Sequence, residues 1–249
     1  MRKIIERSDP VQLDSDLGSL DFEKGELLLI DKPLDWTSFD VVHRVRDLFH
    51  VQKVGHAGTL DPKATGLLIL CTGRRTKEID RYSGCEKEYE GVMTLGATTA
   101  SLDSETPREN QKDYSSVTLE AVKAVFESHR GVQMQVPPMY SAAKHSGKPL
   151  YKYARKGRSL ERQPKEVTIS DLGILDFAPP FVRFRVVCSK GTYVRSLVDQ
   201  CGKELGCGAF LSELRRVRIG DLSLTQALDL DGLYSLSQRR SRLMAEARR

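Results

Sequence analysis

The stretch Gly25-Glu-Leu-Leu-Leu-Ile-Asp31 decides where the fold begins. Its run of apolar residues, bounded by a glycine and an acid, is typical of a buried β-strand. Pro33 closes the strand, because a proline cannot donate to a strand ladder. Thr37 or Ser38 then caps a helix. The apolar residues of that helix recur at helical spacing and are Phe39, Val42, Val45 and Leu48.

Similar patterns continue along the chain. A second buried strand, bounded by glycines, is predicted over 66–73, and the density of Thr, Ser, Asp, Pro and Asn predicts a long surface loop over 98–116. Further strands are predicted over 89–96, 167–175, 182–188 and 222–225, and helices over 119–129 and 193–205. Strands and helices interleave without a regular repeat, so the fold class is α/β of the α+β type.

Length and composition limit the classes of protein to which the chain can belong. The chain has 249 residues, of which 39% are hydrophobic and 29% charged, enough for one large core or two modest ones. Its formal charge of +5 permits a polyanionic partner without demanding one. The N-terminus lacks an apolar signal region, and every apolar run is too short to cross a bilayer. Five cysteines without a C-x-x-C pattern suggest neither disulfides nor zinc. We therefore expect a reduced, cytoplasmic enzyme.

A basic segment with interleaved tyrosines runs from Lys144 to Lys165. It holds eight Lys or Arg residues opposed only by Glu161, and Tyr151 and Tyr153 lie among them. Cations neutralise phosphates and aromatic rings stack on bases, so the segment favours a nucleic-acid partner. The alternative is a solvated basic surface with the tyrosines packed beneath it.

The loop Gly55-His-Ala-Gly-Thr-Leu-Asp-Pro-Lys-Ala-Thr-Gly66 carries the sharpest candidate for chemistry. Its three glycines predict special backbone angles or the close approach of a partner. Pro62 restrains the backbone of Asp61, and a carboxylate on a stiff loop suits nucleophilic or base chemistry. Taken alone, Asp61 is more simply explained as a turn cap, and His56 as a turn or core histidine.

A second dense segment, Cys188-Ser-Lys-Gly-Thr-Tyr-Val-Arg195, joins a predicted strand to a predicted helix. A basic residue on the first turn of that helix can meet an anion near the helix N-terminus. The alternative is that Arg195 is an ordinary surface arginine.

Together these segments resemble the bacterial tRNA pseudouridine-55 synthase family. The resemblance covers about residues 25 to 220, and its motifs occur in the family's order, which makes it specific. The matching stretches are Leu28–Pro33, Gly55–Gly66, Lys87–Tyr89, Pro138–Ala143, Tyr151–Gly157, Cys188–Arg195, Leu205–Ala209 and Leu214–Arg216.

The resemblance implies an isomerase that cleaves the N1–C1′ bond of a uridine, rotates the uracil and rejoins it through C5. Asp61 matches the catalytic aspartate, Arg195 the arginine that pairs with it, and Asp103 a further acid of that charge network. Asp61 must be ionised to attack C1′ or, on the alternative glycal route, to remove the C2′ proton, and Arg195 would favour that state. The reaction is redox-neutral, so no cofactor and no metal are expected.

The resemblance also assigns the residues that hold the substrate. The uridine lies in the folded T arm of tRNA, so it must be flipped out of the stack to be reached. Tyr89 matches the tyrosine that stacks on the target base, while His56, Tyr193 and Leu214 match residues that line the pocket. Residues 133–165 correspond to the insertion that closes on the T arm.

The implied fold is a mixed, mainly antiparallel sheet flanked by helices and loops. We expect an N-terminal extension over 1–24, a pseudouridine synthase catalytic domain over 25–225 with the tRNA-binding insertion at 133–165, and a short basic tail over 226–249. Family members commonly carry a C-terminal RNA-binding domain. Too few residues follow Arg216 for one, so we expect a compact form that needs no protein partner and binds no membrane.

Three other functions compete with this one. A non-catalytic tRNA-binding or folding protein could use the same scaffold, but it would not need both Asp61 and Arg195. A pseudouridine synthase for another RNA, such as the catalytic subunit of a guide-RNA particle, would depend on the RNA-binding domain that is not expected here. A small-molecule enzyme would leave the Lys144–Lys165 surplus without a purpose.

Overall fold

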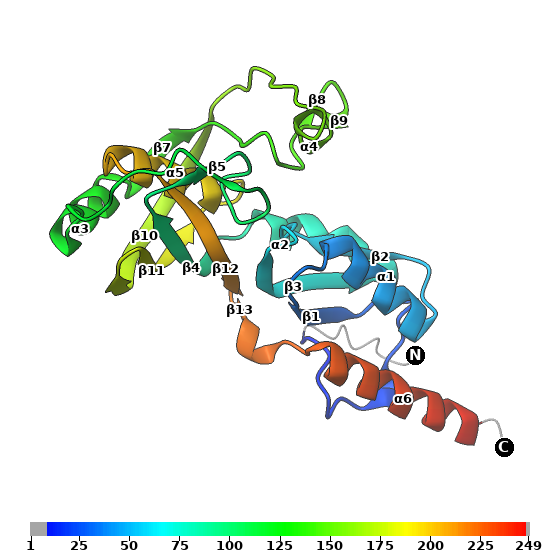
Figure 1. The fold of residues 1–249 in the computed structure, drawn as a ribbon. Helices are drawn as coiled ribbons and strands as arrows, with labels where there is room; N and C mark the ends of the chain where they lie inside the picture. The colour runs from blue at the N-terminus through cyan, green and yellow to red at the C-terminus, as the bar shows by residue number, and fades with distance from the viewer. Residues whose placement is uncertain (1–8, 248–249) are drawn as a thin grey trace. The chain divides into compact units, whose positions relative to one another are not determined.

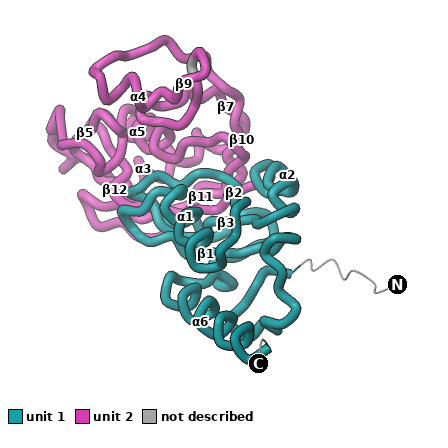
Figure 2. Tube along the Cα trace, turned by 90° about the vertical axis from the view of Figure 1, so that its right-hand side faces the viewer, with its two compact units in different colours: residues 1–85, 215–249 teal, residues 86–214 magenta. Residues whose placement is uncertain are grey.

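The computed structural model describes residues 9–247. Residues 1–8 of the expected N-terminal extension, and Arg248 and Arg249 of the expected tail, lie outside the described residues. The chain forms two compact units, shown in two colours in Figure 2. Unit 1 contains Met1–Cys85 and Arg215–Arg249, and unit 2 contains Glu86–Leu214. Strand β12 (Ala209–Ile219) passes from unit 2 into unit 1.

Unit 1 is built on antiparallel strands that pair through β3. Its elements are the 3-10 helix η1 (Leu17–Ser19), β1 (Leu27–Lys32), α1 (Ser38–Phe49), β2 (Val54–Ala57), β3 (Ala64–Thr72), the 3-10 helix η2 (Gly73–Glu78), α2 (Ile79–Gly84), the end of β12, β13 (Leu222–Ser223), the 3-10 helix η3 (Leu224–Gln226) and α6 (Leu230–Glu246). Strand β1 pairs with β3 from Leu27 opposite Cys71 to Lys32 opposite Gly66. The two strands predicted from apolar runs are therefore direct neighbours.

Helix α1 begins where the sequence predicted. The Thr37 side chain accepts from the Asp40 N–H at 3.1 Å, and the Asp40 carboxylate accepts from the Thr37 N–H at 2.7 Å, which completes a capping box. Its buried stripe is Ser38, Val41, Val42, Val45 and Phe49. Phe39, the first apolar residue of the predicted helical repeat, does not belong to this stripe. Phe39 is 55% exposed, because one step along a helix turns a side chain by about 100°.

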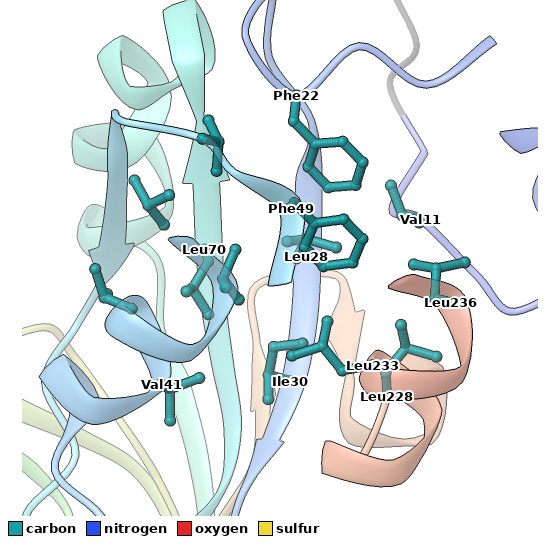
Figure 3. Close-up of a cluster of buried hydrophobic side chains, with 14 of the residues drawn as sticks. Val11, Phe22, Leu28, Ile30, Val41, Phe49, Leu70, Leu228, Leu233 and Leu236 are labelled. Carbon is teal, nitrogen blue, oxygen red and sulfur yellow. The ribbon is translucent and has the colours of Figure 1, made fainter. Parts of the chain in front are cut away.

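The ends of the chain supply part of the core of unit 1 (Figure 3). Val11 and Phe22 come from the segment before β1, and Phe22 stacks on Phe49 with ring centroids 4.2 Å apart. Leu233 and Leu236 come from α6, and both are fully buried. Parts of the expected N-terminal extension and of the expected basic tail therefore pack into the core.

Unit 2 combines longer antiparallel strands with two helices. Its elements are β4 (Lys87–Leu95), β5 (Thr98–Thr99), β6 (Arg108–Glu109), α3 (Leu119–Ser128), β7 (Gly131–Gln135), β8 (Lys144–His145), β9 (Lys148–Pro149), α4 (Tyr151–Ala154), β10 (Lys165–Ala178), β11 (Phe181–Cys188), α5 (Val194–Glu204) and the start of β12. In strand order the sheet runs β12, β4, β11, β10 and β7. Helices α3 and α5 contact one another, and α3 packs on β10 (Figure 1).

Close packing explains one glycine in unit 2. Phe126 of α3 meets Phe184 of β11 edge to face, with ring centroids 6.0 Å apart. A Cβ at Gly91, on the neighbouring strand β4, would lie only 2.8 Å from the Phe184 ring. No larger residue fits beneath that ring without moving it.

The mixed, mainly antiparallel sheet with flanking helices confirms the expected fold class. Two expectations need correction. Residues 98–116 are not wholly a surface loop, because Thr99, Ser101 and Asp103 are buried. Strand β12, which passes through both units, was not predicted at all. Among residues 9–247, no helix has the length and apolar character needed to cross a bilayer.

We expect α6 to contribute directly to stability. Leu233→Ala should lower the free energy of unfolding by about 3 kcal/mol, because it leaves a cavity in the core of unit 1. Leu243→Ala is the matched control on the same helix: Leu243 is 40% exposed, and its loss should cost less than about 0.5 kcal/mol. Urea unfolding of both variants measures the difference. Equal losses would contradict the docking of α6.

Candidate active site

Asp61 lies in the connection between β2 and β3 of unit 1. The Ala64 N–H donates to the Asp61 carbonyl at 3.0 Å, so the backbone turns directly after the carboxylate. Gly58 has a φ of +76°, a conformation that residues with a side chain rarely adopt. Three buried side chains, those of Ser38, Lys32 and Arg216, hold the backbone of this loop.

Ser38, the first residue of α1, holds the residue before Asp61. Its hydroxyl accepts from the Leu60 N–H at 2.9 Å and donates to the Leu60 carbonyl at 3.2 Å. Ser38 and Leu60 are each 3% exposed, so water does not compete for these bonds. One side chain therefore fixes both polar backbone groups next to the carboxylate.

Lys32, the last residue of β1, holds the other side of the loop. Its fully buried ammonium group donates to the Trp36 carbonyl at 2.6 Å and the Pro33 carbonyl at 2.8 Å, and it lies 3.5 Å from the Pro62 carbonyl. Burial lowers the pKa of Lys32 from 10.5 to about 8, although the Asp61 carboxylate nearby acts to raise it. A partly desolvated cation thus stands beside the predicted catalytic acid.

Arg216 of β12 supports the start of the loop from within unit 1. It is 1% exposed, and its guanidinium donates to the Gly58 carbonyl at 2.9 Å and the Leu67 carbonyl at 2.7 Å. A Cβ at Gly66 would lie 2.3 Å from the Arg216 carbonyl oxygen, which explains the glycine there. Burial, and after it the charge of Arg216, lower the pKa of His56. His56 is therefore held in its neutral form at neutral pH.

In unit 2, Arg195 and Asp103 form a buried ion pair. Arg195 lies in the first turn of α5, and its Nη1 is 3.4 Å from the Asp103 Oδ2, with side chains only 4% and 6% exposed. The guanidinium also donates to the Ser101 carbonyl at 2.9 Å and the Tyr140 carbonyl at 2.8 Å. A buried cation with this many acceptors is held in one orientation.

Asp103 is fixed by its own loop. Its Oδ1 accepts from the Ser101 hydroxyl at 2.6 Å and from the Glu105 N–H at 2.9 Å. The Thr99 hydroxyl donates to the Asp103 carbonyl at 2.7 Å. These bonds explain why part of a polar, apparently exposed segment is buried.

The remaining predicted substrate residues of unit 2 lie on three elements. Tyr89 is in β4 opposite Val186 of β11 and is 9% exposed. Tyr193 is the N-cap residue of α5, and Leu214 lies in β12; both are half-buried. The structure thus brings Arg195 and Asp103 into contact and sets His56 and Asp61 on one stretch of unit 1. The roles of all seven residues remain predictions.

The basic segment keeps most of its cations on the surface. Of its eight Lys and Arg residues, all but Arg162 are exposed. Arg155 lies 5.5 Å above the ring of Tyr151 and 3.2 Å from Glu105. Leu150 is buried and anchors the short α4 beside them. Within residues 9–247, no three His, Cys, Asp or Glu side chains cluster in a way that could hold a metal ion.

Comparison with known proteins identifies the family. The model of the TruB family pseudouridylate synthase N-terminal domain matches residues 46–194. The chain belongs to the TruB family. It is 50% identical over 212 residues to tRNA pseudouridine synthase B of Chlorobium chlorochromatii, covering 83% of each chain. It is 47% identical over 212 residues to the protein of the same name from Burkholderia pseudomallei, covering 85% of this chain and 70% of that protein.

Solved structures agree with the TruB assignment. A Cbf5-Nop10-Gar1 complex aligns with a TM-score of 0.67 and 27% identity, over 87% of this chain and 60% of that one. The archaeal box H/ACA sRNP Nop10-Cbf5 complex aligns with a TM-score of 0.65 and 26% identity, over 87% of this chain and 55% of that one. The chain thus spans a little over half of these solved chains. The predicted family and the pseudouridine synthase class of the enzyme are confirmed.

Sequence reasoning missed the supporting roles of Lys32, Ser38 and Arg216 in this TruB chain, although all three stand in stretches that it had quoted. One signal was available. A lysine at the end of an apolar strand, and an arginine at a buried position, are tolerated only when they find partners. Their partners are backbone carbonyls, which a sequence motif does not reveal.

The Ser38 contact predicts a local effect. Ser38→Ala should make the Leu60 amide exchange its hydrogen at least about tenfold faster, because the amide loses a buried acceptor. Ser241→Ala, which removes a hydroxyl that bonds only to the Ser237 carbonyl of α6, is the control. Hydrogen exchange of the peptide spanning the Asp61 loop measures both. Unchanged exchange in Ser38→Ala would contradict the contact.

The pKa of Lys32 predicts a pH dependence of stability. Because that pKa is about 8 in the folded protein, against 10.5 as its ordinary value, the unfolded chain binds more protons between these two pH values. The stability of the wild type relative to Lys32→Met should therefore rise with pH across that window, by up to about 3 kcal/mol. Unfolding midpoints of both proteins at several pH values measure it. A difference that stays constant or falls with pH would refute the lowered pKa.

Proposed function

We propose that the protein converts uridine 55 in the T arm of tRNA to pseudouridine. The observation that carries this proposal is the similarity to proteins named tRNA pseudouridine synthase B, at 50% identity over 83% of both chains. The proposed division of the chain assigns catalysis to 25–225 and the grip on the T arm to 133–165. The reaction would take place in the cytoplasm, without a cofactor and without a protein partner.

In this proposal Asp61 starts the reaction. Its ionised carboxylate either attacks C1′ as a nucleophile or removes the C2′ proton, and in both cases the N1–C1′ bond breaks. The uracil then rotates and bonds to C1′ through C5. C5 loses its hydrogen and N1 gains one, so atoms and electrons balance without any added reagent. The contacts from Ser38 to Leu60 support this role, since they restrict where the carboxylate can move.

Arg195 would set the charge around the reacting sugar. A buried guanidinium favours the ionised form of a nearby carboxylate, and its planar fork constrains direction as well as charge. Asp103 would hold that guanidinium through the ion pair described above. The proposal therefore gives the reacting carboxylate to Asp61 and the charge that favours its ionised state to Arg195.

The flipped base would be recognised by shape and stacking. Tyr89 would replace the lost base stacking, and Leu214 would supply an apolar wall. Tyr193 would complete the pocket. His56 would hold the flipped conformation, and its lowered pKa supports a role for the neutral ring rather than for a cation.

Residues 133–165 are the proposed contact with RNA phosphates, and their exposed cations support this role. The arginines of α6 are less suited to binding RNA phosphates. Arg239 donates to the Leu13 carbonyl, and Arg240 lies 5.0 Å above the buried ring of Phe22, so both are engaged within unit 1. We therefore place the main grip on tRNA in the basic segment rather than in α6.

A second candidate is a pseudouridine synthase that acts on another RNA. The similarity to chains from structures titled Cbf5-Nop10-Gar1 and box H/ACA sRNP, at 26% to 27% identity, favours it. The much higher identity to tRNA pseudouridine synthase B favours tRNA. The third candidate, a non-catalytic tRNA-binding or folding protein, predicts binding without turnover.

The test is to incubate the purified protein with unmodified tRNA transcript and no added cofactor, and to map pseudouridine by position. We expect pseudouridine at position 55 alone. Asp61→Asn should reduce turnover by at least about a thousandfold and leave tRNA affinity nearly unchanged, because it removes the reacting charge but keeps the shape. Asp229→Asn, a substitution at the N-cap of α6, is the control for folding.

The alternative outcomes separate the candidates. Pseudouridine at other positions, or only in other RNAs, would favour the second candidate. Tight tRNA binding by the wild type without any product would favour the binding protein. Substantial residual turnover by Asp61→Asn would remove Asp61 from its proposed role.

A further inference from the structure

We propose that Gln135 is a positioning residue for the reaction, whose buried amide fixes the first turn of α5 and thereby Tyr193 and Arg195. The inference rests on the proposed function, because it takes these two residues as parts of the site. Gln135 is the last residue of β7, and it belongs to none of the predicted site residues. All the groups involved lie within unit 2.

The contact of Gln135 has two points. Its Oε1 accepts from the Tyr193 N–H at 2.7 Å, and its Nε2 donates to the Tyr193 carbonyl at 3.1 Å. The side chain thus pairs with one backbone residue in the way that a neighbouring strand would. Gln135 is 1% exposed, so both bonds form without competition from water.

The contact is made at the N-terminus of α5, where it can fix the position of the first turn. Tyr193 is the N-cap residue, and its carbonyl also accepts the first helical bond, from the Leu197 N–H at 3.2 Å. A tyrosine has no short side-chain oxygen with which to cap a helix, unlike serine or aspartate. Gln135 instead fixes the N-cap residue from outside the helix. Arg195 follows two residues later, so any shift of this turn moves the guanidinium with it.

The chain that follows Gln135 reinforces the same link. The Tyr140 carbonyl accepts from Arg195 at 2.8 Å, and the Ser196 hydroxyl lies 3.4 Å from the Val136 carbonyl. The first residues of the proposed RNA-binding segment are therefore tied to the first turn of α5 at three places. At Gln135 the side chain makes the hydrogen bonds to α5, whereas at Val136 and Tyr140 the backbone carbonyl accepts them.

Only an amide can make both bonds at neutral pH. A glutamate at this position would still accept from the Tyr193 N–H, but its second oxygen would face the Tyr193 carbonyl without a proton between them. Protonation at lower pH would restore the donor. A methionine would fill a similar volume and make neither bond. These two replacements therefore separate hydrogen bonding from packing.

The experiment compares Gln135→Glu and Gln135→Met with the wild type in single-turnover assays on unmodified tRNA transcript labelled with tritium at C5 of uridine. Tritium release follows the isomerisation, and tRNA affinity is measured separately. At about pH 8 both variants should lose at least tenfold in rate while their affinity for tRNA stays within about twofold. Relative to the wild type, Gln135→Glu should recover rate at about pH 6, and Gln135→Met should not.

Gln12→Glu is the matched control. The Gln12 amide also donates to a backbone carbonyl, that of Gln226 at 2.9 Å, but it lies in unit 1 outside the proposed site. It should leave the rate unchanged at both pH values. A rate for Gln135→Glu equal to that of the wild type, or a loss without recovery at low pH, would overturn the inference.

The outcomes also separate this inference from the proposed function. A wild type that releases no tritium from tRNA would refute the proposed function, and the inference would fall with it. An active wild type with fully active Gln135 variants would overturn the inference alone. Failure of both variants to fold would assign Gln135 to stability, and it too would overturn the positioning role.

Discussion

Backbone groups in buried loops must find hydrogen-bond partners, and here side chains from neighbouring elements supply them. Residues 58–63, the connection that carries Asp61, form no strand ladder, and Leu60 within it is buried. Ser38, Lys32 and Arg216 donate to four of the carbonyls around it, those of Leu60, Trp36, Gly58 and Leu67. Because an unmade buried hydrogen bond costs about 1–3 kcal/mol, these contacts decide which loop conformation is stable.

This arrangement brings charge into the protein interior. Lys32 and Arg216 are almost completely buried, and both donate to carbonyl oxygens. A carbonyl accepts a hydrogen bond without neutralising the cation, so the positive charge persists inside the protein. Such charge is costly unless the donors are satisfied, which explains why these side chains make several bonds each. The consequence, within unit 1, is that Lys32 and Arg216 place positive charge near the loop that carries the predicted catalytic carboxylate.

The sequence predicted elements best where local pattern and packing agree. The apolar runs of β1 and β3 and the capped start of α1 are examples. Strand β12 was not predicted because one of its buried positions is Arg216, so a charged residue interrupts the pattern of apolar residues. The repeat that contains Phe39 allows two neighbouring apolar stripes on the helix, and only the packing of the helix in the fold decides which stripe is buried. The contribution of α6 to the core was not predicted, because Leu233 and Leu236 lie in a segment that is rich in arginine.

The predicted site residues are visible in local sequence motifs, whereas the residues that support them are not. Asp61 and Arg195 stand in dense local motifs that are visible in the sequence itself. Ser38 and Gln135 make contacts with residues 22 and 58 positions away. Both bond the N–H and the carbonyl of a single residue that lies within two positions of a predicted catalytic one. Because nearly every residue presents the same N–H and carbonyl groups, the sequence does not reveal which residue such a side chain will bond. Such supports become visible only when the fold brings the two segments together, and their loss would shift a predicted catalytic residue without changing that residue itself.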